Sequence, residues 1–282
     1  MIYLSTGAYN SITGYEAAKL FLENGIDCIE LSGGKADEKL VEKLHALKGS
    51  CELQIHNYFP PPKDPFVFNL ASNDSSIAEK SLKHAFNAID FAVRFGCASY
   101  GFHAGFLLDP KVNELGQKIK NQNLESRKKA KALFVQRVNE VSSYAQQKGV
   151  KILLENNVIS ETNFKEFGTN PLLMTNHFET IEMMNATDNN VGLLVDVAHL
   201  KVSSLTEGFC KKEYLEATSE FTCAYHFSDN DGRFDYNDPV SADSWFWPYV
   251  RRDLDYYTLE VYIQDLKLLK DQIKLVALML AD

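Results

Sequence analysis

The sequence predicts a single (β/α)8 TIM barrel, an α/β fold spanning residues 1–282 as one domain. Eight short apolar segments rich in β-branched and aromatic residues alternate with segments of helical periodicity, and eight parallel strands is the number that closes a barrel. The connections that follow the strand segments are long, whereas those that precede them are short, as in a barrel with one functional face. The strand segments are 2–6, 28–31, 52–55, 99–103, 151–155, 192–195, 222–226 and 257–261.

The segments between the strands carry helix signals. Thr13 with Glu16, and Ser76 with Glu79, predict capping boxes at the start of two helices. Apolar residues at helical spacing predict further helices around 40–47, 138–145 and 266–276. Glycines just before the next strand predict helix ends, and these are Gly25, Gly49, Gly96 and Gly149.

An open doubly wound sheet is the alternative fold, because it also places its site at the carboxyl ends of parallel strands. No GxGxxG or Walker-type loop follows any strand segment. The nucleotide-binding versions of that fold therefore lose support.

Composition limits the classes of function. A hydrophobic content of 45% allows a large core, and a net charge of −9 disfavours a surface that holds nucleic acid. The five cysteines are odd in number and widely spaced, unlike a disulfide framework. The sequence has no signal-peptide pattern and no apolar run long enough to span a membrane. We expect a cytoplasmic protein that acts on small molecules.

Ionisable residues stand at the carboxyl ends of the predicted strands. Burying so many unpaired charges at a barrel mouth would cost several kcal/mol each, so a shared metal ion is the economical explanation. Glutamate, aspartate and histidine ligands from four consecutive strands are predicted to hold one divalent ion. These ligands are Glu155, Asp196, His226 and Glu260; the other residues at the same end are Glu30, His56, His103 and His199. Glu30 could instead pair with a neighbouring lysine.

Four motifs carry a resemblance to a known family. They are LLENN at 153–157, VDVAHL at 195–200, HFSD at 226–229 and TLEVY at 258–262. In order and spacing they resemble the xylose isomerase-like TIM-barrel superfamily, which includes sugar isomerases, ketose 3-epimerases, inosose dehydratases and the endonuclease IV family of nucleases. The resemblance extends over nearly the whole chain.

The resemblance implies a site and a reaction. In the epimerase-like members the residues that match Glu155, Asp196, His226 and Glu260 hold one divalent cation (manganese, magnesium, cobalt or zinc). The histidine after the aspartate and an arginine after the metal-binding histidine contact the substrate, which implies His199 and Arg233 here. The substrate would be a sugar or a sugar phosphate, and a homodimer is a further expectation of the resemblance.

The residue types also suggest a mechanism. A bound cation would polarise a carbonyl and acidify the adjacent C–H bond. A carboxylate on each face could then remove a proton and return it, and Glu155 and Glu260 are the candidates. A hydride shift between adjacent carbons would use the same metal. In isomerase-like relatives the matching histidines contact substrate oxygens, so the resemblance implies that role for His56 and His103.

Two other functions stay open. In endonuclease IV relatives, histidines that match His56 and His103 build a second metal position with the shared glutamate, so a second ion there would indicate a phosphodiesterase. Their third position needs an Asp-x-His motif, whereas Asp231 is followed by Arg233 and no histidine occurs after His226. Together with the acidic charge, this makes nucleic acid an improbable partner. A non-catalytic metal-binding barrel is the other alternative, because a fold does not prove a function.

Overall fold

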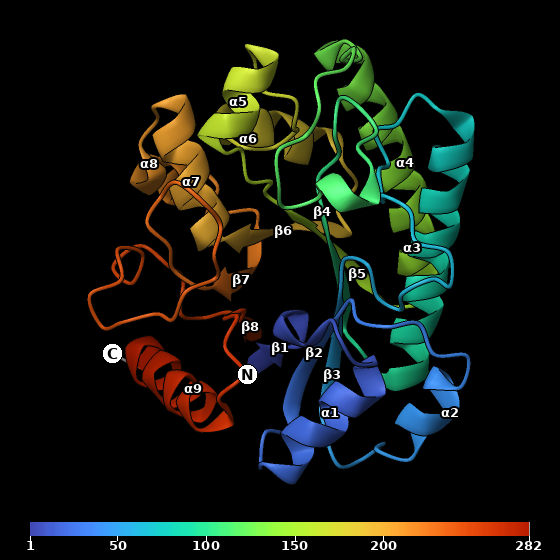
Figure 1. The fold of residues 1–282 in the computed structure, drawn as a ribbon, viewed down its shortest axis with the longest axis vertical. Coiled ribbons are helices and arrows are strands. Elements are labelled where there is room, and N and C mark those ends of the chain that lie inside the picture. Colours follow the sequence, from blue (N-terminus) through green and yellow to red (C-terminus); the bar gives the residue numbers. More distant parts are fainter. Residues whose placement is uncertain (282) are drawn as a thin grey trace.

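The computed structural model describes residues 1–281 and shows a closed barrel of eight parallel strands with helices around it (Figure 1). Each strand pairs with the next along the chain, and β1 pairs with β8 to close the ring. All eight predicted strands are confirmed, each to within two residues at either end. They are β1 Ile2–Ser5, β2 Cys28–Ser32, β3 Glu52–His56, β4 Ser99–His103, β5 Lys151–Glu155, β6 Val191–Asp196, β7 Thr222–Phe227 and β8 Tyr256–Leu259.

Helices follow most of the strands and form the outer layer. The α-helices are α1 Gly14–Glu23, α2 Leu40–His45, α3 Ser75–Phe95, α4 Arg127–Gln147, α5 Glu161–Phe167, α6 His177–Ala186, α7 Val197–Glu207, α8 Lys211–Ala217 and α9 Leu266–Ala281. The C-terminal helix α9 contacts both β8 and β1, so it covers the seam where the ring closes (Figure 1). No helix within residues 1–281 is long and apolar enough to cross a membrane.

The connection between β7 and β8 departs from the predicted alternation, because residues 228–255 contain no α-helix. Aromatic side chains from this connection cover the outer face of β7 instead. Phe246 is fully buried and stacks on Phe227, with ring centroids 5.3 Å apart, and Trp247 packs against the same ring. The aromatic rings thus bury the apolar surface that a helix buries elsewhere in the barrel.

Helix starts test the predicted capping boxes. The box of Thr13 and Glu16 is confirmed at the start of α1. The box at Ser76 is wrong, because the N-cap of α3 is Asp74 and Ser76 already lies in the first turn. The Asp74 carboxylate accepts hydrogen bonds from the backbone N–H groups of Ser76 and Ile77, at 2.8 and 3.1 Å. A negative charge at this position also complements the helix dipole, so Asp74 is the stronger cap.

Asp74→Ala is therefore expected to lower the free energy of unfolding by about 1 kcal/mol, the usual cost of losing an N-cap. Denaturant unfolding followed by circular dichroism would measure it. Ser76→Ala is the matched control and should change stability by much less. A larger loss in Ser76→Ala than in Asp74→Ala would contradict the corrected cap.

The glycines before strands were predicted to end helices, and the structure places them unequally. Gly96 is the C-cap of α3, with a left-handed backbone (φ 75°). Gly25 and Gly149 each lie one residue beyond the C-cap of their helix, and Gly49 lies three residues beyond that of α2. All four have positive φ, so they end or follow helices where other residues would be strained.

The barrel interior has an apolar layer and a polar layer. The apolar layer is a buried cluster on five strands: Tyr3, Leu153, Leu194, Ala224 and Tyr256. Successive side chains of a strand point to opposite faces, so residues two positions further along each strand return to the interior. At that level the residues are Ser5, Glu155, Asp196, His226 and Thr258, all buried. The two-residue period of the strands thus places ionisable side chains next to the apolar layer, on its carboxyl-terminal side.

Candidate metal centre and active site

Four predicted ligands converge at the carboxyl end of the barrel. Glu155 ends β5, Asp196 ends β6, His226 lies near the end of β7, and Glu260 directly follows β8. One ligand atom from each can be chosen so that all four lie within 4.8 Å of one another. All four side chains are buried. Side chains that are far apart in the sequence therefore surround one point, as the strand pattern predicted.

The VDVAHL motif gives Asp196 two tasks. Its Oδ1 accepts a hydrogen bond of 2.7 Å from the backbone N–H of His199, which caps α7. Its Oδ2 is buried and has no hydrogen-bond partner. One carboxylate oxygen of Asp196 thus fixes the turn from β6 to α7, and the other is available to bind a metal ion.

Unpaired buried atoms show whether these residues suit a cation. His226 Nδ1 forms ion-pair contacts with Glu260 Oε2 at 2.8 Å and Glu155 Oε1 at 3.4 Å, but neither contact has good hydrogen-bond geometry. Both oxygens of Glu155 and Asp196 Oδ2 are likewise buried without a hydrogen bond. Buried carboxylates and imidazoles without such bonds are costly, whereas a shared divalent ion would satisfy them together. The residues present therefore fit a metal ion.

A second group shares Glu155. The Nε2 atoms of His56 and His103 lie 3.0 and 3.2 Å from Glu155 Oε2. These three side chains also have ligand atoms close enough to hold a cation. Gly101 on β4 allows this packing, since a Cβ there would come within 3.2 Å of His56 Nδ1. Glu155 thus belongs to both groups: one oxygen faces the other candidate ligands, and the other faces the two histidines.

His199 lies beside the cluster, but Arg233 does not. The His199 ring donates from Nδ1 to the carbonyl oxygen of Asn156 at 2.9 Å, and its Nε2 lies 3.1 Å from Asp235 Oδ2. Arg233 is exposed and forms no ion pair within residues 1–281. The Asp231 side chain accepts from the backbone N–H of Arg233, in a tight turn after which Asp235 reaches the site. The residue of this loop that reaches the site is thus Asp235, which contacts His199, and not Arg233, which was expected there.

Two further residues escaped the sequence-based assignment. Glu30 does not pair with a lysine: it lies inside the barrel, 3.2 Å from His226 Nε2. Tyr262 donates its hydroxyl to Glu260 Oε1 at 3.3 Å. Gly7 permits that contact, because a Cβ there would lie 2.9 Å from the Tyr262 ring. The position of Glu30 at a strand end was the available signal; Tyr262 ends the TLEVY motif but was given no role, and nothing in the sequence indicated Asp235.

Comparison with known proteins now places the chain. The model of the family described as xylose isomerase-like TIM barrel matches residues 14–255. The chain belongs to this family. No curated protein matches the sequence.

Solved structures agree with this xylose isomerase-like fold. A D-tagatose 3-epimerase-like protein is similar with a TM-score of 0.72 and 17% identity, over 98% of each chain. The 3-keto-D-glucoside 4-epimerase YcjR from E. coli has a TM-score of 0.67 and 11% identity, over 100% of this chain and 99% of its own. A protein from Thermus thermophilus, in crystals soaked with ZnCl2, has a TM-score of 0.64 and 19% identity, over 98% of each chain. At these identities the likeness establishes the fold.

The carboxyl groups of this xylose isomerase-like barrel have pKa values shifted in opposite directions. Burial raises the pKa of Asp196 to about 7, against the lowering effect of His199. Burial also acts to raise the pKa of Glu155, but His103, His56 and His226 hold it well below the usual value. For Glu260 the effect of burial is outweighed by His226, which lowers the pKa to about 2. Without a cation, the histidines therefore balance ionised glutamates.

The pKa values of the histidines in the cluster are also shifted in opposite directions. Burial lowers the pKa of His103 to about 4, despite the nearby Glu155 carboxylate. Burial also acts to lower the pKa of His226, but the carboxylates of Glu30 and Glu155 raise it well above the usual value. In the metal-free protein His226 therefore holds a proton that a cation would have to displace.

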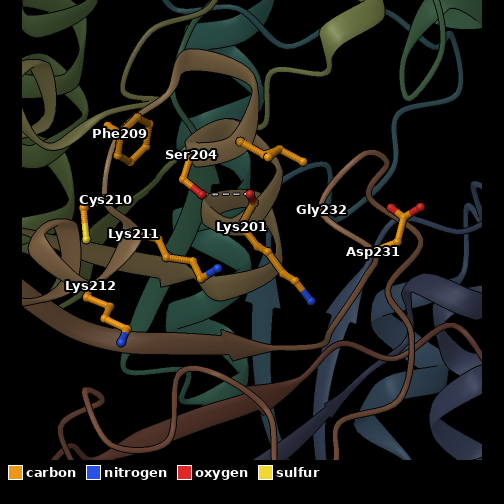
Figure 2. Close-up of a pocket in the computed structure, with 9 residues that line it drawn as sticks. Lys201, Ser204, Phe209, Cys210, Lys211, Lys212, Asp231 and Gly232 are labelled. Carbon is orange, nitrogen blue, oxygen red and sulfur yellow. Dashed lines mark hydrogen bonds between the residues drawn. The ribbon is translucent and has the colours of Figure 1, made fainter.

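A separate surface pocket lies away from this cluster. It has a volume of about 420 Å³ and lies between α7, α8 and the β7–β8 connection (Figure 2). Lys201, Lys211 and Lys212 line it, with Asp231 on the opposite side (Figure 2). Lys201 is already bound to Asp229, with its Nζ 2.6 Å from Oδ1. None of the clustered carboxylates and histidines lines this pocket.

Proposed function

We propose that this protein is a divalent-metal-dependent sugar isomerase or epimerase that moves a proton at a carbon next to a carbonyl. The observation that carries the proposal is the convergence of Glu155, Asp196, His226 and Glu260, with buried ligand atoms that lack hydrogen bonds. Relatives in fold support it, since several are named as sugar epimerases. The substrate in this proposal is a sugar or sugar phosphate, and the ion is manganese, magnesium, cobalt or zinc.

The two glutamates are suited to act as the acid/base pair. A bound divalent ion would supply a Lewis acid that polarises the carbonyl and lowers the pKa of the neighbouring C–H. Each glutamate turns one oxygen toward His226. The other oxygen of Glu155 faces His56 and His103, and that of Glu260 faces Tyr262. In this proposal the two outer oxygens, which have different neighbours, act on opposite faces of the substrate, where one removes a proton and the other returns it.

Histidines at the mouth would orient the substrate. His103 is partly exposed, and His199 is held by the Asn156 carbonyl. In this proposal His56, His103 and His199 contact substrate oxygens. Arg233 is exposed, so a contact with the substrate would require its loop to turn inward. Asp235 already lies beside His199, which makes it the nearer partner for a sugar hydroxyl.

Turnover in D2O would test the proposal. Metal-depleted protein, reloaded with Mn²⁺, Mg²⁺, Co²⁺ or Zn²⁺, would be incubated with a panel of ketoses, aldoses and their phosphates. We expect metal-dependent conversion with deuterium at the carbon next to the carbonyl. Conversion without deuterium would indicate a hydride shift instead. Metal binding without conversion of any sugar would favour a non-catalytic barrel.

The group of His56, His103 and Glu155 is the observation that favours a second function, an endonuclease IV-like phosphodiesterase. A two-ion site of this kind would suit phosphodiester hydrolysis. The net charge of −9 weighs against a nucleic-acid substrate. Incubation of the same metal-loaded protein with an oligonucleotide that contains an abasic site is the matching assay. Cleavage there, with no sugar conversion, would replace the first proposal.

A further inference from the structure

Glu30 is a buried carboxylate that the proposed reaction does not use. It lies on β2, is 1% exposed and faces the barrel interior. Its Oε2 accepts a hydrogen bond of 2.8 Å from the Thr258 hydroxyl on β8. The same oxygen accepts from His226 Nε2 at 3.3 Å, and Oε1 lies 3.2 Å from that nitrogen. Glu30 forms no ion pair with a lysine or arginine within residues 1–281.

The His226 ring therefore connects two sets of carboxylates. Its Nδ1 faces Glu260 and Glu155, while its Nε2 faces Glu30. A neutral imidazole carries one N–H, and its other nitrogen offers a lone pair. An ionised carboxylate can only accept a hydrogen bond, so Glu30 favours the proton on Nε2. The lone pair of Nδ1 then points toward the proposed metal centre.

Glu30 could instead belong to a cation site of its own, because Glu30, His56 and His226 also have ligand atoms within 4.8 Å of one another. That site would need the lone pair of His226 Nε2, and the neutral ring cannot ligate through both nitrogens. The Thr258 hydroxyl also already occupies one oxygen of Glu30. These contacts favour a hydrogen-bonding role over ligation.

We propose that Glu30 is a positioning residue, which holds His226 with its proton on Nε2 and so directs Nδ1 to the metal ion. The proposal rests on the metal centre of the proposed function. Carboxylates that accept from the second nitrogen of a ligating histidine fix its orientation and raise its basicity. Thr258 fixes Glu30 in turn, so β2, β7 and β8 act together on one ligand.

Two variants test this inference. Glu30→Gln keeps the shape but removes the charge, and Thr258→Val removes the hydroxyl that holds Glu30. Zinc affinity would be measured by competition with a chelating dye. We expect Glu30→Gln to weaken zinc binding about 10- to 100-fold, the usual loss for such partners, and Thr258→Val to weaken it less. The matched control is Glu114→Gln, a buried carboxylate whose hydrogen bonds within residues 1–281 come from the backbone N–H groups of Lys111 and Lys120.

Nitrogen NMR of histidine-labelled, zinc-loaded protein gives a readout that a merely structural role would not change. In the wild type His226 should show a protonated Nε2 and a metal-bound Nδ1, and the Nε2–H signal should shift in both variants. Unchanged affinity and unchanged signals in the variants would overturn the inference while leaving the proposed function intact. An ion found between Glu30 and His226 Nε2 would overturn it as well. Wild-type protein that binds no divalent ion would overturn both proposals.

Discussion

Glu155→Gln is expected to lower kcat for sugar conversion by about 10³-fold, within the range that general acid–base groups contribute. The change removes a proton acceptor at the centre and, in the same step, a charged ligand of the proposed metal ion. Glu155 lies between His56, His103 and His226, so its loss also leaves three imidazoles, two of them buried, without their common carboxylate. Steady-state kinetics at saturating metal would measure the loss.

Glu260→Gln is expected to cause a similar loss, because the account assigns it the opposite face of the substrate. Both variants should remain folded by circular dichroism, and Glu114→Gln should keep wild-type activity. Deuterium exchange into the substrate would separate the two roles, since each variant should fail to exchange one of the two epimers. A fully active Glu260→Gln protein would remove that residue from the mechanism.

Removal of the metal is expected to abolish turnover and to lower the melting temperature. A ligand that binds only the folded state adds stability as RT ln(1 + [L]/Kd), about 2.7 kcal/mol at 100 times Kd.

Metal affinity should also rise with pH. Asp196, with a pKa of about 7, and His226, with a pKa well above its usual value, must lose protons to become ligands. Protons therefore compete with the ion, and affinity increases as the pH rises through about 7.

Calorimetry of metal binding in buffers of different ionisation enthalpy would count the protons released, and thermal unfolding with and without a chelator would measure the stability. Chelator-treated protein that regains activity on addition of the ion alone provides the control. Full activity after removal of the metal, or affinity that falls as the pH rises, would contradict the account.

The strands, and the convergence of the four candidate ligands at one end of the barrel, could be predicted from the sequence because both depend on local pattern. Apolar runs marked the strands, and the polar residue that ended each run marked its carboxyl end. Glu155, Asp196 and His226 lie two positions beyond Leu153, Leu194 and Ala224 of the apolar layer. A side-chain period of two residues thus brings them to one level of the barrel.

The remaining features depend on contacts between distant segments, which no local pattern encodes. Glu30 meets His226 across the barrel interior, and its role follows only from that contact. Asp235 reaches His199 because a tight turn at Asp231 directs the loop, whereas the sequence offered Arg233 at a similar spacing. The α3 cap was misplaced because Asp74 and Ser76 are both residue types that cap helices and lie two positions apart, so the pattern alone does not decide between them, whereas the structure shows Asp74 accepting from the backbone N–H groups of Ser76 and Ile77.

A zinc-soaked crystal structure with anomalous diffraction data would show directly whether the four side chains at the barrel mouth share one ion. We expect an ion within about 2.0–2.2 Å of one atom from each of Glu155, Asp196, His226 and Glu260. A second peak between His56 and His103 would add weight to the phosphodiesterase alternative. Anomalous density elsewhere in the protein, with none among these four side chains, would contradict the account.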